Sequence, residues 1–176
     1  MELPSITLFG VLLISSSSGC YEPDVSLEKL KDFHRRRLQV LIEAGPDMLA
    51  LKTIPNKLEA RACIELLEEE NVQIPSWIRF TTVDGENAPS GESFEDCLEV
   101  INNSNRVHAV GINCAPPHFI DNLICKFKHP SKYFDDHDFE SHARRWRDLG
   151  AKIIGGCCRT TPLTIKIISD ALGEKS

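Results

Sequence analysis

Short apolar runs alternate with longer stretches in which apolar residues recur at helical spacing. The runs predict buried strands, and the helical spacing predicts amphipathic helices packed against them. The predicted strands are Met48 to Leu51, Trp77 to Val83, His108 to Cys114 and Ala151 to Gly155. The predicted helices are Leu27 to about Gly45 (after an N-cap at Ser26), Asn56 to Glu70, Ser93 to Ile101, Pro116 to Phe127, Asp138 to Leu149 and Thr161 to Leu172. Asp84 to Gly91 is rich in turn-forming residues and predicts a loop.

This alternation is typical of an α/β protein with a parallel sheet. The rhythm breaks after Phe127, where two predicted helices follow each other with no apolar strand between them. A closed (β/α)8 barrel has eight strands and usually about 250 residues, whereas this chain has 176 residues and four or five predicted strands. We therefore expect an incomplete (β/α)8 TIM-type barrel with several strands missing.

The first 24 residues differ from the rest, and we divide the chain into an apolar segment at 1–24 and a partial barrel domain at 25–176. The run from Ile6 to Ile14 is too short to cross a bilayer, which needs about 20 apolar residues. Its outline suits a secretory signal, but it is preceded by Glu2 and by no Lys or Arg. The alternatives are an apolar strand or a sequence introduced by an altered gene start.

Charge and cysteine content narrow the function classes. A formal net charge of −6 and a pI near 5.5 argue against a nucleic-acid or anionic-membrane surface. The basic clusters at 35–37 and 144–145 lie in helical patterns with acids nearby and predict solvated helix faces. Seven cysteines in a regular αβ pattern indicate reduced thiols in the cytoplasm more than a disulfide framework.

Three of those cysteines stand at the carboxyl ends of predicted strands. Gly111-Ile112-Asn113-Cys114 ends one, and Gly155-Gly156-Cys157-Cys158-Arg159-Thr160 follows another. Three thiolates can hold a metal and leave a fourth position open for a substrate. The alternatives are small buried side chains and, less in keeping with adjacent cysteines, a redox pair.

Several other side chains receive a structural interpretation. Cys63, Cys97 and Cys125 lie on helical patterns and predict buried thiols, while Trp77 and Trp146 predict core positions. His137 and His142 lie in a charged helix and predict solvent-facing rings. For Arg159 a contact with a substrate carboxylate and a structural cap stay equally open.

The two cysteine motifs, in this order, resemble those of the zinc-dependent homocysteine S-methyltransferases. The likeness extends over most of 25–172, through Thr53-Ile54-Pro55-Asn56 and Ser90-Gly91-Glu92-Ser93, and is greatest to the plant-type enzymes that use S-methylmethionine. The resemblance implies zinc held by Cys114, Cys157 and Cys158, with Asn113 and Gly156 shaping the pocket. It also implies methyl transfer from a sulfonium donor (S-methylmethionine or S-adenosylmethionine) to homocysteine, for methionine biosynthesis. No separate catalytic side chain is implied, because the metal-bound sulfur is itself the nucleophile.

Three departures from the family favour an alternative function. The family's Asp-Gly-Gly-type segment on its first strand has no counterpart, and Lys52 stands where the family has a glutamate that holds the amino group of homocysteine. The segment of the seventh strand is absent between Phe127 and Asp135. The alternative is a catalytically impaired zinc-binding remnant, and we expect its open sheet edges to favour self-association. A third hypothesis, a secreted thiol-rich binding module, rests only on the apolar N-terminus.

Overall fold

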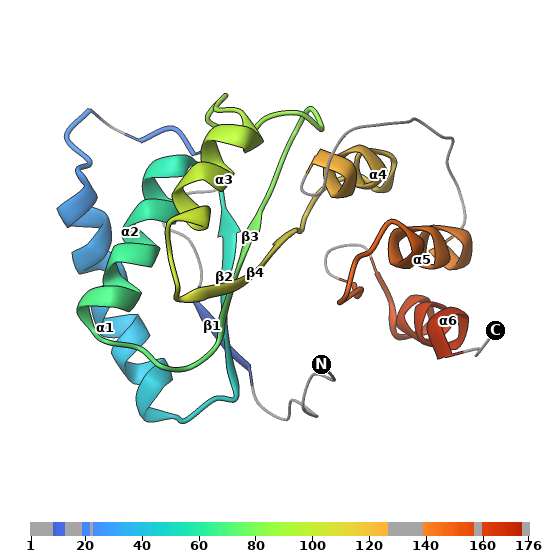
Figure 1. Cartoon of the computed structure of the whole chain (residues 1–176), viewed down its shortest axis with the longest axis horizontal. Coiled ribbons are helices and arrows are strands. Elements are labelled where there is room, and N and C mark those ends of the chain that lie inside the picture. The colour runs from blue at the N-terminus through green and yellow to red at the C-terminus, as the bar shows by residue number, and fades with distance from the viewer. Residues whose placement is uncertain (1–8, 13–18, 22, 127–138, 157–159, 174–176) are drawn as a thin grey trace. The chain divides into compact units, whose positions relative to one another are not determined.

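Four parallel strands form a single sheet in the computed structural model, which describes residues 9–12, 19–21, 23–126, 139–156 and 160–173. The strands are β1 (Phe9–Leu12), β2 (Met48–Ile54), β3 (Ser76–Phe80) and β4 (Val107–Ile112), and they lie in that order across the sheet (Figure 1). The chain divides into two compact units, Met1–Asn113 and Cys114–Ser176, and the whole sheet belongs to the first. The predicted α/β class with a parallel sheet is confirmed, and the N-terminal apolar run contributes a strand.

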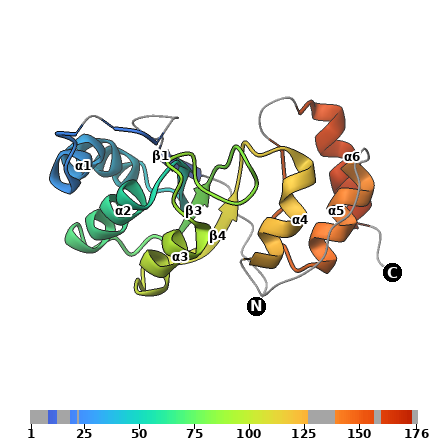
Figure 2. The same cartoon turned by 90° about the horizontal axis from the view of Figure 1, so that it is seen from above.

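Three helices connect the strands of the first unit and lie along one face of the sheet (Figures 1 and 2). They are α1 (Leu27–Glu43), α2 (Lys57–Glu69) and α3 (Phe94–Asn102). Each begins after a polar side chain that accepts a hydrogen bond from a backbone N–H of the first turn, as N-caps do. The caps are Ser26, Asn56 and Ser93, which accept from the amides of Lys29, Glu59 and Asp96.

The core of the first unit lies between the sheet and these helices. Its fully buried large apolar strand side chains are Leu49, Leu51, Ile54, Ile78 and Phe80. The Phe80 ring meets that of Phe94 on α3, with centroids 6.1 Å apart. On the alternate strand positions Met48, Ala50 and Trp77 form a smaller buried cluster, and the guanidinium of Arg79 lies 4.1 Å from the Trp77 ring. The predicted core position of Trp77 is confirmed.

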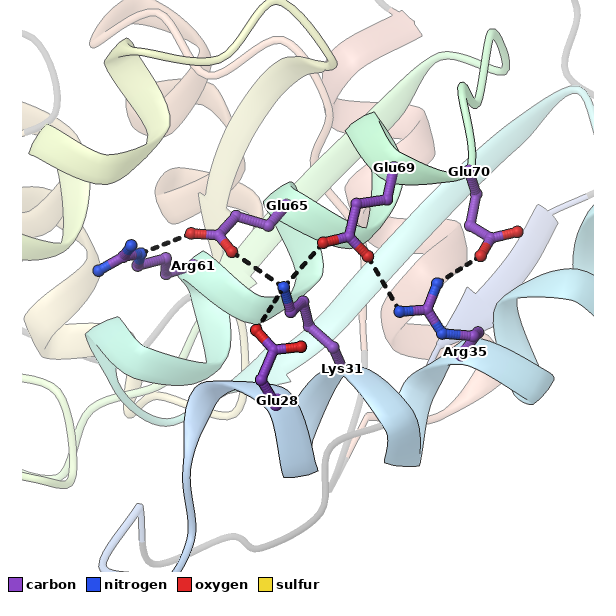
Figure 3. A network of polar contacts seen from close by, with 7 residues as sticks. All are labelled: Glu28, Lys31, Arg35, Arg61, Glu65, Glu69 and Glu70. Atoms are coloured by element: carbon purple, nitrogen blue, oxygen red, sulfur yellow. Dashed lines mark hydrogen bonds and ion pairs between the residues drawn. The ribbon is translucent and has the colours of Figure 1, made fainter.

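An ion-pair network joins α1 to α2 at the surface (Figure 3). Lys31 Nζ lies 2.7 Å from Glu28, 3.2 Å from Glu65 and 2.7 Å from Glu69. Arg35 continues the network to Glu69 at 2.9 Å. Hydrogen bonds from Lys31 and Arg35 hold the pKa of the Glu69 carboxyl below its ordinary value. Lys31 is 4% exposed, so its ammonium is held between the carboxylates of the two helices, whereas the more exposed ion pairs of Arg35 each contribute little to stability.

A buried polar cluster ties the segment 19–21 to the same two helices. His34 on α1 and Glu59 on α2 are 1% and 0% exposed, and His34 Nε2 lies 2.6 Å from Glu59 Oε1. Tyr21 donates its hydroxyl to the second oxygen of Glu59. Gly19 packs so closely that an added Cβ would lie 2.6 Å from the carbonyl oxygen of Pro55, at a φ of +68° that favours glycine. The first unit therefore includes residues 19–21 as an integral part.

The second unit contains α4 (Pro117–Lys126), α5 (Phe139–Asp148) and α6 (Pro162–Gly173). Its buried apolar side chains are Leu123, Ala143, Trp146, Ile168 and Ala171. Trp146 Nε1 donates to Asp121 at 3.0 Å, so the predicted core position of this tryptophan is confirmed. None of the described residues of this unit forms a strand.

Two predictions for this unit are wrong. The strand predicted for Ala151 to Gly155 is not formed. This segment pairs with none of the described strands, and its Ile153 is 44% exposed rather than buried. His142 does not face solvent: it is 9% exposed and stacks on Trp146 with ring centroids 5.3 Å apart. His137 lies outside the described residues. No helix in the described part of the chain is long and apolar enough to cross a membrane.

Candidate functional site

The carboxyl ends of β2, β3 and β4 meet at one edge of the sheet, where Asn113 follows the last residue of β4. Asn113 is 7% exposed, and its backbone N–H donates to the carbonyl oxygen of Phe80 at 2.9 Å. Its side-chain nitrogen donates to Thr53 Oγ1 at 2.6 Å. The predicted substrate-binding residue is thus a buried amide held from two neighbouring strand ends.

Cys114 leaves the strand geometry directly after Asn113. Its φ is +54°, a value uncommon for a residue with a side chain, and the residue is exposed. Positive φ outside glycine often marks a functional position. An exposed thiol at the end of a parallel strand has the access that a metal ligand needs, and the role of Cys114 as a ligand stays a prediction.

The cysteines on helices are less exposed than Cys114. Cys63 and Cys97 are 1% and 0% exposed, as predicted. Burial raises the pKa of the Cys97 thiol to about 12 and that of Cys63 above its ordinary value as well. Both thiols therefore stay protonated and inert near neutral pH. Cys125 is half-buried, less than predicted.

Lys52 lies next to Thr53 at the carboxyl end of β2 and is half-buried. The register between β2 and β3 shifts here: Leu51 pairs with Ile78 and Ile54 with Phe80. Two residues of β2 therefore stand opposite Arg79 alone, which is the geometry of a bulge and re-aims side chains. The bulge places a cation, Lys52, at the sheet edge that carries Asn113.

The loop after β3 is held by a second set of polar contacts. Thr82 Oγ1 donates to the carbonyl oxygen of Asn87 at 2.7 Å, and Asp84 accepts from the amides of Glu86 and Asn87, each at 2.8 Å. The amides of Asn87 and then Glu86 hold the pKa of the Asp84 carboxyl well below its ordinary value. The predicted loop over 84–91 is confirmed as an ordered turn at the same end of the sheet.

The other two predicted metal ligands, Cys157 and Cys158, lie outside the described residues, as does Arg159. Residues on either side of them are described. A Cβ added to Gly156 would lie 2.5 Å from Ile165 Cδ1 and closer still to Thr160 Oγ1, whereas one on Gly155 would meet nothing within 4 Å. No cluster of three metal-binding side chains occurs among the residues that the structure describes. Gly156, unlike Gly155, therefore has no room for a side chain at the position directly before the two cysteines.

These features define the class: an α/β protein with a parallel sheet, whose strand ends present a buried amide and an exposed thiol. The model of one family, described as homocysteine S-methyltransferase, matches residues 5–172. This chain belongs to the homocysteine S-methyltransferase family.

Two proteins similar in sequence and one similar in structure are methyltransferases by name. Homocysteine S-methyltransferase 1 of Arabidopsis thaliana is 61% identical over 197 residues, covering 97% of this chain and 60% of the relative. Selenocysteine Se-methyltransferase of Brassica oleracea var. italica is 41% identical, covering 96% of this chain and 56% of the relative. The metallated form of the homocysteine methyltransferase MmuM from Escherichia coli superposes with a TM-score of 0.77 at 31% identity, covering 88% of this chain and 54% of that one.

The chain spans about 60% of the length of the curated relatives it matches. The alignment with the Arabidopsis protein runs over 197 positions, while this chain has 176 residues. At least 21 positions inside the matched region therefore have no counterpart here. Residues are missing within the region of similarity, in keeping with the break in the αβ rhythm after Phe127.

Proposed function

We propose that this chain is a zinc-dependent homocysteine S-methyltransferase, which transfers a methyl group from a sulfonium donor to homocysteine to form methionine. S-methylmethionine and S-adenosylmethionine are the candidate donors. The observation that carries the proposal is the exposed thiol of Cys114, directly after the buried Asn113, in a chain of this family. A cytoplasmic location is part of the proposal, since the cysteines must stay reduced to bind metal.

Cys114, Cys157 and Cys158 would hold the zinc. The donor set fits, because thiolates are preferred zinc ligands, and glycine at 156, where a side chain would collide with Thr160 and Ile165, lets the chain turn just before the two adjacent cysteines. When bound, zinc supplies a position at which a substrate thiol is held as the more nucleophilic thiolate. Asn113 would bind the amino-acid end of homocysteine and orient its sulfur. The donor's leaving group is a neutral thioether, so no side chain has to protonate it.

Lys52 works against this binding. A lysine ammonium has the same sign of charge as the amino group of homocysteine, and like charges repel each other. Lys52 would therefore weaken homocysteine binding without affecting the metal ligands.

We also propose that the fold is an incomplete (β/α)8 barrel and that the chain self-associates through its open sheet edges. In the described sheet β1 and β4 are the outer strands, and the side chains of β4 are exposed or half-buried. Unpaired strand edges favour association between chains. Elution from a size-exclusion column as a dimer or larger assembly supports the proposal, and a monomer counts against it.

A second candidate function is a zinc-binding remnant without turnover. It is favoured by Lys52 and by the positions missing within the matched region. Both functions share the metal site and differ only in whether methyl transfer occurs.

The proposed function is tested by methionine formation from homocysteine and S-methylmethionine with the purified, zinc-loaded chain. We expect turnover that is abolished in Cys114→Ala and retained in Cys125→Ala, the matched control on α4. Lys52→Glu is expected to lower the KM for homocysteine, because it exchanges repulsion for attraction. Absence of turnover in both the parent and Lys52→Glu would select the remnant.

A further inference from the structure

A hydrogen bond joins two strand ends that are not neighbours in the sheet. Asn113, at the end of β4, donates from Nδ2 to Thr53 Oγ1 on β2 at 2.6 Å. β3 lies between these strands, so the bond passes over the end of β3. At 2.6 Å the contact is short for an N–H···O bond, for which about 2.9 Å is usual.

Thr53 can reach Asn113 because of the irregularity in β2. Leu51 and Ile54 both pair regularly with β3, and the two residues between them stand opposite one residue of that strand. A bulge of this kind redirects side chains at the end of a strand. The contact requires a hydroxyl group at position 53. Its oxygen accepts the hydrogen bond from the amide nitrogen, and a methyl group cannot accept one.

The bond determines the orientation of the Asn113 carboxamide. The nitrogen is directed at Thr53, and the backbone is fixed independently by the bond from Asn113 N–H to Phe80 at 2.9 Å. Both ends of the residue are therefore held before any ligand arrives. Holding a binding group in place beforehand favours affinity, because the ligand does not have to order it.

We infer that Thr53 is a positioning residue for the substrate, acting through the Asn113 amide. The inference rests on the proposed function, in which Asn113 binds the amino-acid end of homocysteine. It adds a side chain that acts without touching the substrate. Loss of the Thr53 hydroxyl removes the hydrogen bond that directs the amide nitrogen and so weakens the alignment of the carboxamide with the ligand.

The experiment compares Thr53→Val with Thr53→Ser. Valine keeps the β-branched shape that suits a strand but removes the hydroxyl, whereas serine keeps the hydroxyl. We expect Thr53→Val to weaken homocysteine binding to the zinc-loaded chain about tenfold, and Thr53→Ser to stay within about threefold of the parent. Isothermal titration calorimetry gives both affinities, and far-UV circular dichroism checks that each variant is folded. Thr53→Ala replaces Thr53→Val if valine prevents folding.

A second readout follows the amide itself. The side-chain NH2 signals of Asn113 in a ¹⁵N-labelled chain, assigned by their loss in Asn113→Asp, should shift in Thr53→Val and stay near their parent positions in Thr53→Ser. A mere packing role for Thr53 would not produce this split between the variants. Unchanged homocysteine affinity in folded Thr53→Val overturns the inference, whether or not the NH2 signals move. A parent chain that binds zinc but no homocysteine would overturn the proposed function itself.

Discussion

Zinc affinity is expected to fall at least about tenfold in Gly156→Ala and to stay unchanged in Gly155→Ala. An alanine Cβ at 156 would lie 2.5 Å from Ile165 Cδ1 and 2.9 Å from Thr160 Cβ. Neither distance is compatible with ordinary packing, so the side chains of Ile165 and Thr160 would have to move away from the added methyl group. Ile165 Cδ1 can rotate away, but Thr160 Cβ moves only with its backbone. Because Gly156 precedes the two proposed ligands and Thr160 follows shortly after them, this movement would displace them.

Competition with a chromophoric zinc chelator measures the effect in the two variants and the parent. Gly155→Ala is the matched control, since it adds the same methyl group one residue away with nothing within 4 Å. Equal zinc affinity in Gly156→Ala and the parent would show that the packing against α6 does not position the ligands.

Removal of the Glu59 carboxylate is expected to destabilise the chain by about 3 kcal/mol. Glu59 is 0% exposed and contacts both His34 and Tyr21. In Glu59→Leu the His34 ring stays buried without its carboxylate partner, and leaving such a group unsatisfied is what makes breaking a buried pair costly. A loss of this size is a large fraction of the roughly 5–15 kcal/mol that stabilises an ordinary domain.

Urea unfolding followed by far-UV circular dichroism measures this loss. Glu68→Leu is the control on the same helix: Glu68 is exposed, so its replacement should change the free energy of unfolding by less than about 0.5 kcal/mol. The double variant His34→Phe/Glu59→Leu should recover part of the loss, because it removes the unsatisfied ring nitrogen. Equal stability of Glu59→Leu and Glu68→Leu would contradict the structural role of the cluster.

Local signals in the sequence were sufficient for the helices. The helices that follow Ser26, Asn56 and Ser93 begin where the sequence predicts them, because the start of a helix depends on residues only a few positions apart. Strands were predicted less well, since a strand requires a neighbour to pair with. The apolar run Phe9–Leu12 pairs with β2 and forms a strand. The apolar run Ala151 to Gly155 pairs with none of the described strands.

The candidate site was predicted in part for the same reason. Asn113 and Cys114 stand in a motif, and the structure places them at the end of β4, as expected for a functional strand end. The contact between Thr53 and Asn113 spans 60 positions in the chain and depends on a bulge, so no local pattern could reveal it. The burial of His142 against Trp146 was also missed, because a charged helix gives no sign of which face the other helices cover.

The central claim is that three cysteines hold one metal ion, and it is tested most directly by the zinc content of the purified chain. We expect about one zinc per chain in the parent and in Cys125→Ala, and almost none in Cys114→Ala or Cys157→Ala, since a site with two remaining thiolates binds weakly. Elemental analysis after dialysis against a weak chelator gives these values. A parent without zinc, or zinc that persists in Cys157→Ala, would contradict the account.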